Sequence, residues 1–190
     1  MIPSPRLLRL RLSDCERRNL AGFVIGFGIT IITWATLHDI YLIGVEPRHF
    51  TEYHRPLLPI TNHTLLALQY ATVATLGPGM VFGAFAFACS RLGRRVPLGF
   101  RTAWLTFLPF VALIEITALL VGRHAASLHA HGLALPYPAA FYPDGSAGIA
   151  YTQSVNVTAY FAAAVFGASY QLLLVLLRAK RTHAVAHLDR

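Results

Sequence analysis

Four apolar stretches, each long enough to cross a lipid bilayer as a helix, dominate this sequence of 190 residues. A membrane-spanning helix needs about 20 apolar residues, because each residue advances the helix by about 1.5 Å. The stretches cover residues 20–44, 63–89, 102–122 and 151–177. Within lipid, only helices or closed barrels satisfy all of their backbone hydrogen-bonding groups. We therefore expect an all-α integral membrane protein, an antiparallel four-helix transmembrane bundle formed by residues 1–190 as one domain.

The composition supports a membrane location. Hydrophobic residues make up 55% of the chain and charged residues only 13%, and the mean hydropathy is +0.53. Such a chain is too apolar and too poor in charge for a water-soluble domain. The two cysteines, Cys15 and Cys89, are too far apart in the sequence for a Cys-x-x-Cys redox motif.

The distribution of basic residues predicts the orientation in the membrane. Of the 16 Lys and Arg residues, 13 fall before the first stretch, in residues 90–101 or in the tail 178–190, and the other three are Arg48, Arg55 and Arg123. Short loops rich in Lys and Arg stay in the cytoplasm. We therefore expect both termini to be cytoplasmic and the loops 45–62 and 123–150 to face outward.

The N-terminal region predicts a retained anchor. Ser13 and Glu16 form a capping-box pattern that would begin a helix before the membrane. The first apolar stretch is too long for a signal peptide, and no small-residue cleavage site follows it. Lys180 is the only lysine beside 15 arginines, which is typical of GC-rich bacterial coding. The expected location is a bacterial inner membrane, with the lipid bilayer as the first partner.

Small residues recur at helical spacing within three of the stretches. Such rows let helix backbones approach closely, either within the bundle or in a homo-oligomer or larger membrane complex. They are Gly22 and Gly26, Gly79 and Gly83, and Ala159, Ala163 and Gly167. Pro78 and Pro109 predict kinks in the second and third helices, because proline removes a backbone hydrogen bond.

Ionisable side chains gather at one depth on the expected outer side. At about 1.5 Å per residue, His38 and Asp39 lie about 27 Å from the inner start of the first stretch, and Glu115 lies about 21 Å from Arg101. His63 begins the second stretch from the outside. Ionisable groups within the hydrocarbon region are costly and mark functional sites. Glu115 and Asp39 are the candidate catalytic carboxylates, although each could instead join helices or reach outer water.

Histidines follow the same outward bias. Seven of the nine lie on the outer side or at its boundary: His38, His49, His54, His63, His124, His129 and His131. Imidazole and carboxylate groups together suit copper, zinc or iron. Two histidines on facing helices at one depth, such as His38 with His63 or His124, could instead ligate a haem b iron. None of the spacings matches a known metal signature such as His-Glu-x-x-His.

Several functions are poorly supported. The chain has no glycine-rich phosphate loop and no Gly-x-Ser-x-Gly motif. Anionic lipid headgroups explain the basic inner segments, so we expect no nucleic-acid partner. The leading hypothesis is a metal- or haem-binding site, with a redox role among its uses, in the outer leaflet. The alternatives are a proton- or cation-coupled transport or channel subunit and a non-catalytic subunit of a larger membrane complex.

Overall fold

The computed structural model describes residues 12–54 and 57–188, and within these ranges all regular structure is helical. Four helices are long and apolar enough to cross a membrane, which confirms the expectation of an all-helical chain with four candidate spans. They are α1 (Asp14–Val45), α3 (His63–Arg91), α4 (Phe100–Ala130) and α5 (Ala147–Leu188). The short helix α2 (Arg48–Thr51) and the 3-10 turn η1 (Ala139–Phe141) lie between them. These features support a multi-pass membrane protein.

The helices extend beyond the expected spans because polar caps and turns continue them past the apolar core. Ser13 caps α1 by accepting a hydrogen bond from the Glu16 backbone N–H at 3.3 Å, as the capping-box pattern predicts. Asn62 caps α3 in the same way, accepting from Leu65 N–H at 3.1 Å. Five of the basic residues that predict the orientation lie outside the described residues, at positions 6, 9, 11, 55 and 190.

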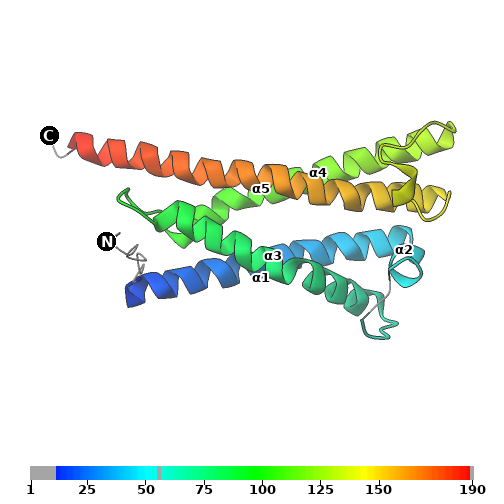
Figure 1. The fold of residues 1–190 in the computed structure, drawn as a ribbon, viewed down its shortest axis with the longest axis horizontal. Coiled ribbons are helices and arrows are strands. Elements are labelled where there is room, and N and C mark those ends of the chain that lie inside the picture. The colour runs from blue at the N-terminus through cyan, green and yellow to red at the C-terminus, as the bar shows by residue number, and fades with distance from the viewer. Residues whose placement is uncertain (1–11, 55–56, 189–190) are drawn as a thin grey trace, which may run out of the picture.

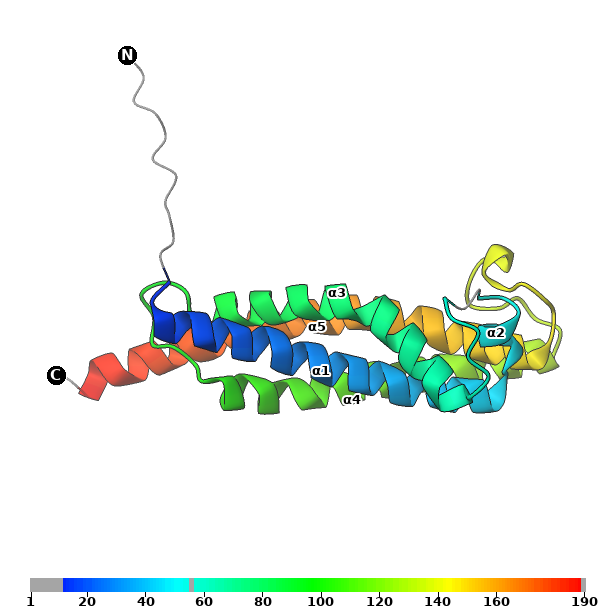
Figure 2. The ribbon, with the colours of Figure 1, turned by 90° about the horizontal axis from the view of Figure 1, so that it is seen from below.

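The long helices form two pairs. Helix α1 packs mainly along α3, and α4 packs mainly along α5, whereas α3 contacts α5 less extensively. Figure 1 shows each pair crossing and the pairs lying side by side. The start of α1, the end of α5 and the segment between α3 and α4 lie at one end of the molecule, and α2 lies at the other (Figure 2).

Close backbone contact joins α1 to α3. A Cβ atom at Gly83 would lie 2.7 Å from the Phe23 carbonyl oxygen and 2.8 Å from Val24 Cα, and one at Gly79 would lie 3.3 Å from Gly28 Cα. Neither position leaves room for a side chain, so this glycine pair serves packing within the chain. Helix α3 also contains Pro78 and bends along its length (Figure 2), as expected for an internal proline.

Arg178 fixes the segment between α3 and α4 to α5. This side chain is 5% exposed, and its guanidinium donates hydrogen bonds to the carbonyl oxygens of Cys89, Leu92 and Arg95 at 2.9, 2.9 and 3.1 Å. Hydrogen bonds to backbone carbonyl groups therefore stabilise the buried charge of Arg178. One end of the bundle is held together by this residue.

Candidate functional site

A histidine–carboxylate pair joins the half of α1 that precedes α2 to the facing half of α4. His38 Nδ1 lies 2.9 Å from Glu115 Oε2, and Trp34 Nε1–H donates to the same oxygen at 3.0 Å. Trp34 and His38 are four residues apart on α1 and so share one face of the helix. The His38 ring is buried, with 5% of its surface exposed.

His38 keeps one nitrogen free. Its Nε2 atom is buried without a hydrogen-bond partner among the described residues. When Glu115 is ionised, Nδ1 must donate to it, and a neutral His38 ring then carries its lone pair on Nε2. Histidines that ligate metals are held in this way, because the carboxylate fixes the ring orientation and makes the free nitrogen more basic.

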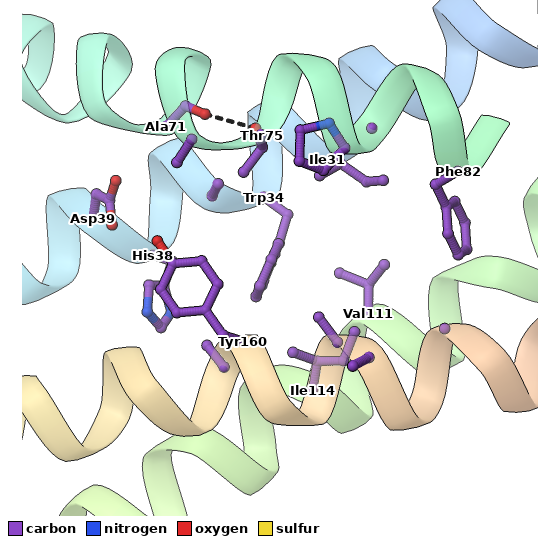
Figure 3. Close-up of a pocket in the computed structure, with 18 of the residues that line it drawn as sticks. Ile31, Trp34, His38, Asp39, Ala71, Thr75, Phe82, Val111, Ile114 and Tyr160 are labelled. Atoms are coloured by element: carbon purple, nitrogen blue, oxygen red, sulfur yellow. Dashed lines mark hydrogen bonds between the residues drawn. The ribbon is translucent and has the colours of Figure 1, made fainter.

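His38 lies at the polar end of a cavity between the two helix pairs. The cavity has a volume of about 340 Å³ and is lined by α1, α3, α4 and α5. Figure 3 shows His38 and Asp39 at one end of this space and Phe82 and Val111 at the other. Asn156 adds a third polar group to the lining. The space therefore has apolar walls and a concentration of hydrogen-bonding groups toward α2.

Small side chains leave the space open. Ala159, Ala163 and Gly167, the row on α5 that the sequence associates with close helix contact, all line the cavity. Gly79 and Ala71 face it from α3. Along α5 the lining runs from Asn156 to Gly167, a length of about 16 Å. The α5 row of small residues thus creates volume within the bundle.

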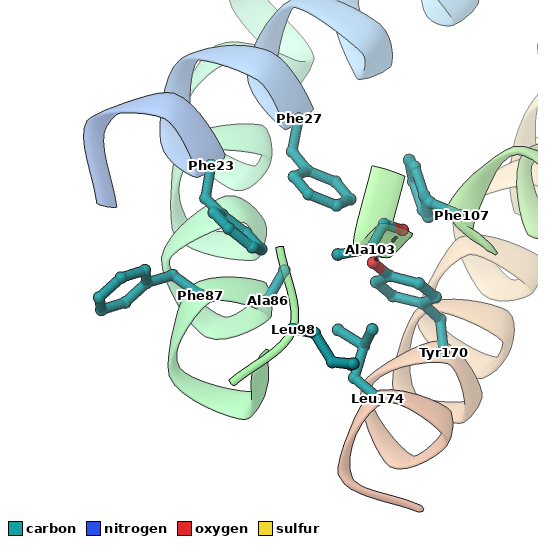
Figure 4. Close-up of a cluster of buried hydrophobic side chains, with 9 residues drawn as sticks. All are labelled: Phe23, Phe27, Ala86, Phe87, Leu98, Ala103, Phe107, Tyr170 and Leu174. Carbon is teal, nitrogen blue, oxygen red and sulfur yellow. Dashed lines mark hydrogen bonds between the residues drawn. The ribbon is translucent and has the colours of Figure 1, made fainter. Parts of the chain in front are cut away.

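A cluster of buried aromatic side chains closes the other end of the cavity, and we call it the aromatic cluster: Phe23, Phe27, Phe87, Phe107 and Tyr170. Phe107 belongs to both the cavity wall and the cluster, and Phe82 packs against the cluster. Figure 4 shows Phe27, Phe107 and Tyr170 gathered together, and the ring centroids of Phe107 and Tyr170 are 5.1 Å apart. Tyr170 is fully buried and its hydroxyl donates to the Ala103 carbonyl at 2.8 Å. The cavity is therefore closed toward the end of the molecule where α1 begins and α5 ends.

A second, smaller space of about 170 Å³ adjoins the cavity on the side of α2, and we call it the outer chamber because it lies farther from the middle of the helices. It is lined by His49, His54 and Tyr70, and it shares Asp39 and Asn156 with the cavity. His49 is 1% exposed, and its ring centroid lies 4.5 Å from that of His54. Polar groups thus continue from the cavity to the α1–α3 loop.

His49 is held neutral in this chamber. Asn156 Nδ2 lies 3.3 Å from His49 Nε2, while His49 Nδ1 is buried without a partner in the described part of the chain. Burial, and next the charge of His54, lower the pKa of His49 from 6.5 to about 4, and Glu46 opposes the effect. At neutral pH the ring therefore offers a neutral imidazole to the chamber.

An ionic cluster joins the α1–α3 loop to the α4–α5 loop. Arg48 donates hydrogen bonds to Glu46 at 2.9 Å and to Asp144 at 3.1 Å, and Tyr53 donates to Asp144 at 2.6 Å. The bond from Tyr53 and those from Ser146 lower the pKa of Asp144 to about 2. Hydrogen bonding from Arg48 likewise lowers the pKa of Glu46. The cluster connects the α1–α3 loop to the α4–α5 loop beside the outer chamber.

Four of the candidate residues line these two spaces, namely His38, Asp39, His49 and His54, and Glu115 lines neither space but contacts His38. The other candidates line neither space. His63 and His124 are exposed on α3 and α4, while His129 bonds the Gly145 carbonyl and His131 the Ser127 carbonyl, both at 2.7 Å. No group of three or more His, Cys, Asp or Glu residues in the described ranges is arranged to hold a metal ion.

Trp34 and Tyr160 are site residues that are not among the sequence candidates. Trp34 binds Glu115, and Tyr160 lines both the cavity and the outer chamber. The spacing of four residues between Trp34 and His38 indicates a shared helix face. The sequence gives no comparable signal for Tyr160, which lies in an apolar helix among other aromatic residues.

Comparisons with protein-family models, with curated proteins and with solved structures find no match to this chain.

Proposed function

We propose that the chain is an antiparallel transmembrane bundle of the bacterial inner membrane with both termini cytoplasmic. The excess of basic residues at the end that carries Arg91, Arg95 and Arg178 supports this orientation. A single cysteine introduced by Arg95→Cys into a cysteine-free background should react with an impermeant maleimide only after the membrane is disrupted. Labelling of this cysteine in intact cells would show that the orientation is the opposite of the one proposed.

Within this topology, we propose a redox-active ligand site in the outer leaflet, with His38 as the direct contact. The observation that supports this proposal most directly is that His38 Nε2 is buried without a hydrogen-bond partner among the described residues. Glu115 fixes the orientation of the His38 ring. A transition metal or haem b is the cofactor class that this donor set supports. Glu115 acts through His38 as a positioning residue, and Asp39 is the nearest carboxylate in the cavity lining.

Haem needs fewer protein ligands than a bare metal ion, although enclosing a complete haem would require the two helix pairs to separate beyond the cavity of about 340 Å³. A porphyrin supplies four of the iron ligands, so the protein needs to contribute only one or two axial groups. One oriented imidazole beside apolar walls meets that need. A bare copper, zinc or iron ion would need two or more further ligands, for which His49 and His54 in the adjoining chamber are the available imidazoles.

A proton- or cation-coupled transport role is the second candidate. It is favoured by Asp39, which lines both the cavity and the outer chamber and so connects the outer loops to the middle of the bundle. The aromatic cluster around Phe107 and Tyr170 opposes it, because it closes the path toward the opposite end. This role would require those rings to move.

The test is spectroscopic and elemental analysis of protein purified from its own membrane. The wild type should carry a Soret band or a bound transition metal, and His38→Ala should lose it, because the direct ligand is gone. The matched control is His63→Ala, at an exposed histidine outside the cavity, and it should retain the cofactor. Equal cofactor content in both variants would remove His38 from the site.

A further inference from the structure

We propose that the cavity binds the ring of a prenylated quinone or quinol taken up from the bilayer, with the ring oxygens toward His38 and the prenyl chain toward the aromatic cluster. This inference rests on the proposed function, since it names the ligand of the same site.

The size of the cavity favours a single substituted ring. An engineered protein cavity of about 150 Å³ binds benzene, and the cavity here, about 340 Å³, is roughly twice as large. A quinone ring with its substituents and the first part of a prenyl chain needs about this volume. A complete haem needs more than this space provides, so the helix pairs would have to separate to enclose it.

The chemistry of the polar end matches ring oxygens. His38 Nε2 is a buried, unpartnered nitrogen among the described residues, at the cavity end that also holds Asp39 and Asn156. A quinol hydroxyl can donate to the lone pair of a neutral imidazole, and a quinone carbonyl can accept from an amide or a protonated ring. A buried polar atom left without a partner is costly, and a bound ring oxygen would supply that partner.

Aromatic side chains line the walls of the cavity, which suits an aromatic ligand. Trp34, Phe82, Phe107 and Tyr160 present their rings to the cavity from four different helices. Aromatic rings attract one another in stacked and edge-to-face arrangements beyond the effect of burial. A saturated acyl chain would gain the burial but not this additional attraction between rings.

The cavity reaches the lipid-facing surface between α3 and α5. Ala74 and Pro78 on α3, and Tyr160 and Ala164 on α5, line it and are also exposed. These two helices contact each other less extensively than the paired helices do. A lipid-soluble molecule can therefore pass sideways from the hydrocarbon into the cavity without crossing the outer loops.

The direction of the cavity matches a molecule anchored in lipid. Its polar groups lie toward the outer loops, and its apolar end lies against the aromatic cluster nearer the middle of the helices. Prenylquinones have the same polarity, with a polar ring on a long apolar chain.

The test uses ubiquinone-2 as the probe and Trp34 as the reporter. The chain has two tryptophans, so the Trp104→Phe variant leaves Trp34, which lines the cavity, as the only one. Quinone binding should quench its fluorescence in a saturable manner. Ala163→Phe fills the cavity from α5, and the matched control Ala168→Phe adds the same ring at an exposed position of α5 outside the lining.

We expect Ala163→Phe to weaken ubiquinone-2 binding by about tenfold or more, equivalent to about 1.4 kcal/mol, while Ala168→Phe leaves it unchanged. If Ala163→Phe does not fold, His38→Ala serves instead and should weaken binding several-fold through loss of one hydrogen bond. Unchanged binding in these variants would overturn the proposal.

The outcomes separate this inference from the proposed function. Wild-type protein that fails to bind ubiquinone-2 but carries a haem or metal dependent on His38 refutes the quinone and retains the proposed site. Protein that has neither refutes both.

Discussion

Acidification from pH 7 to pH 5 should destabilise the folded protein through His49. Its folded-state pKa of about 4 lies below the ordinary value of 6.5, so the folded state favours the neutral ring. The resulting stability is fully present above pH 6.5 and is lost as the pH falls toward 4. A difference of this size corresponds to about 3 kcal/mol in total, of which about 2 kcal/mol is lost by pH 5.

The assay is thermal unfolding of the detergent-purified protein at both pH values. For a chain of this length, 2 kcal/mol corresponds to a decrease in Tm of about 4–8 °C. His49→Gln keeps a hydrogen-bonding side chain for Asn156 but does not titrate, so it should lose most of this decrease. His63→Gln, at an exposed ring, should keep it. An equal decrease in wild type and His49→Gln would refute the assignment of the acid sensitivity to the buried ring.

Three further predictions follow from the packing and the charges. Gly83→Ala should cost about 1–3 kcal/mol of unfolding free energy through overpacking, whereas Gly77→Ala, which meets nothing within 4 Å, should cost none, as thermal unfolding can measure. The ionised form of Asp144 stabilises the folded state because its pKa is lowered, and this stability is lost as the pH falls from about 4 toward 2. Asp144→Asn should therefore abolish the loss of thermal stability over that pH range. The same loss in wild type and variant would argue against the ionic cluster. Glu115→Gln keeps size and an acceptor for the indole of α1, so it should lower ligand or cofactor content with little change in Tm, and normal content at normal Tm would defeat the role of the carboxylate.

The sequence predicts the helices better than it predicts their ends or their pairing. Apolar length identifies all four long helices, because lipid leaves the backbone no other way to satisfy its hydrogen bonds. Hydropathy marks only the hydrocarbon-embedded part, so α4 continues eight residues past the expected boundary, from 122 to Ala130. The division into an α1–α3 pair and an α4–α5 pair depends on side-chain packing that hydropathy does not encode.

The sequence predicts part of the candidate site. Counting residues from the membrane boundary puts His38 and Glu115 at one depth, and the structure brings them to 2.9 Å. Depth alone does not give the rotation of each helix, so His63 and His124 are equally good candidates by that criterion, although both are exposed. His49 reaches the outer chamber because α2 folds back over the bundle, which the loop sequence does not reveal.

The most direct measurement is a structure of the protein in lipid nanodiscs, prepared from its own membrane without added ligand. We expect density for a ring in the cavity between the two helix pairs, or for a haem between helix pairs that have moved apart, with an atom within about 3.2 Å of His38 Nε2. A cavity filled by the protein's own side chains, with His38 Nε2 paired to one of them, would contradict it.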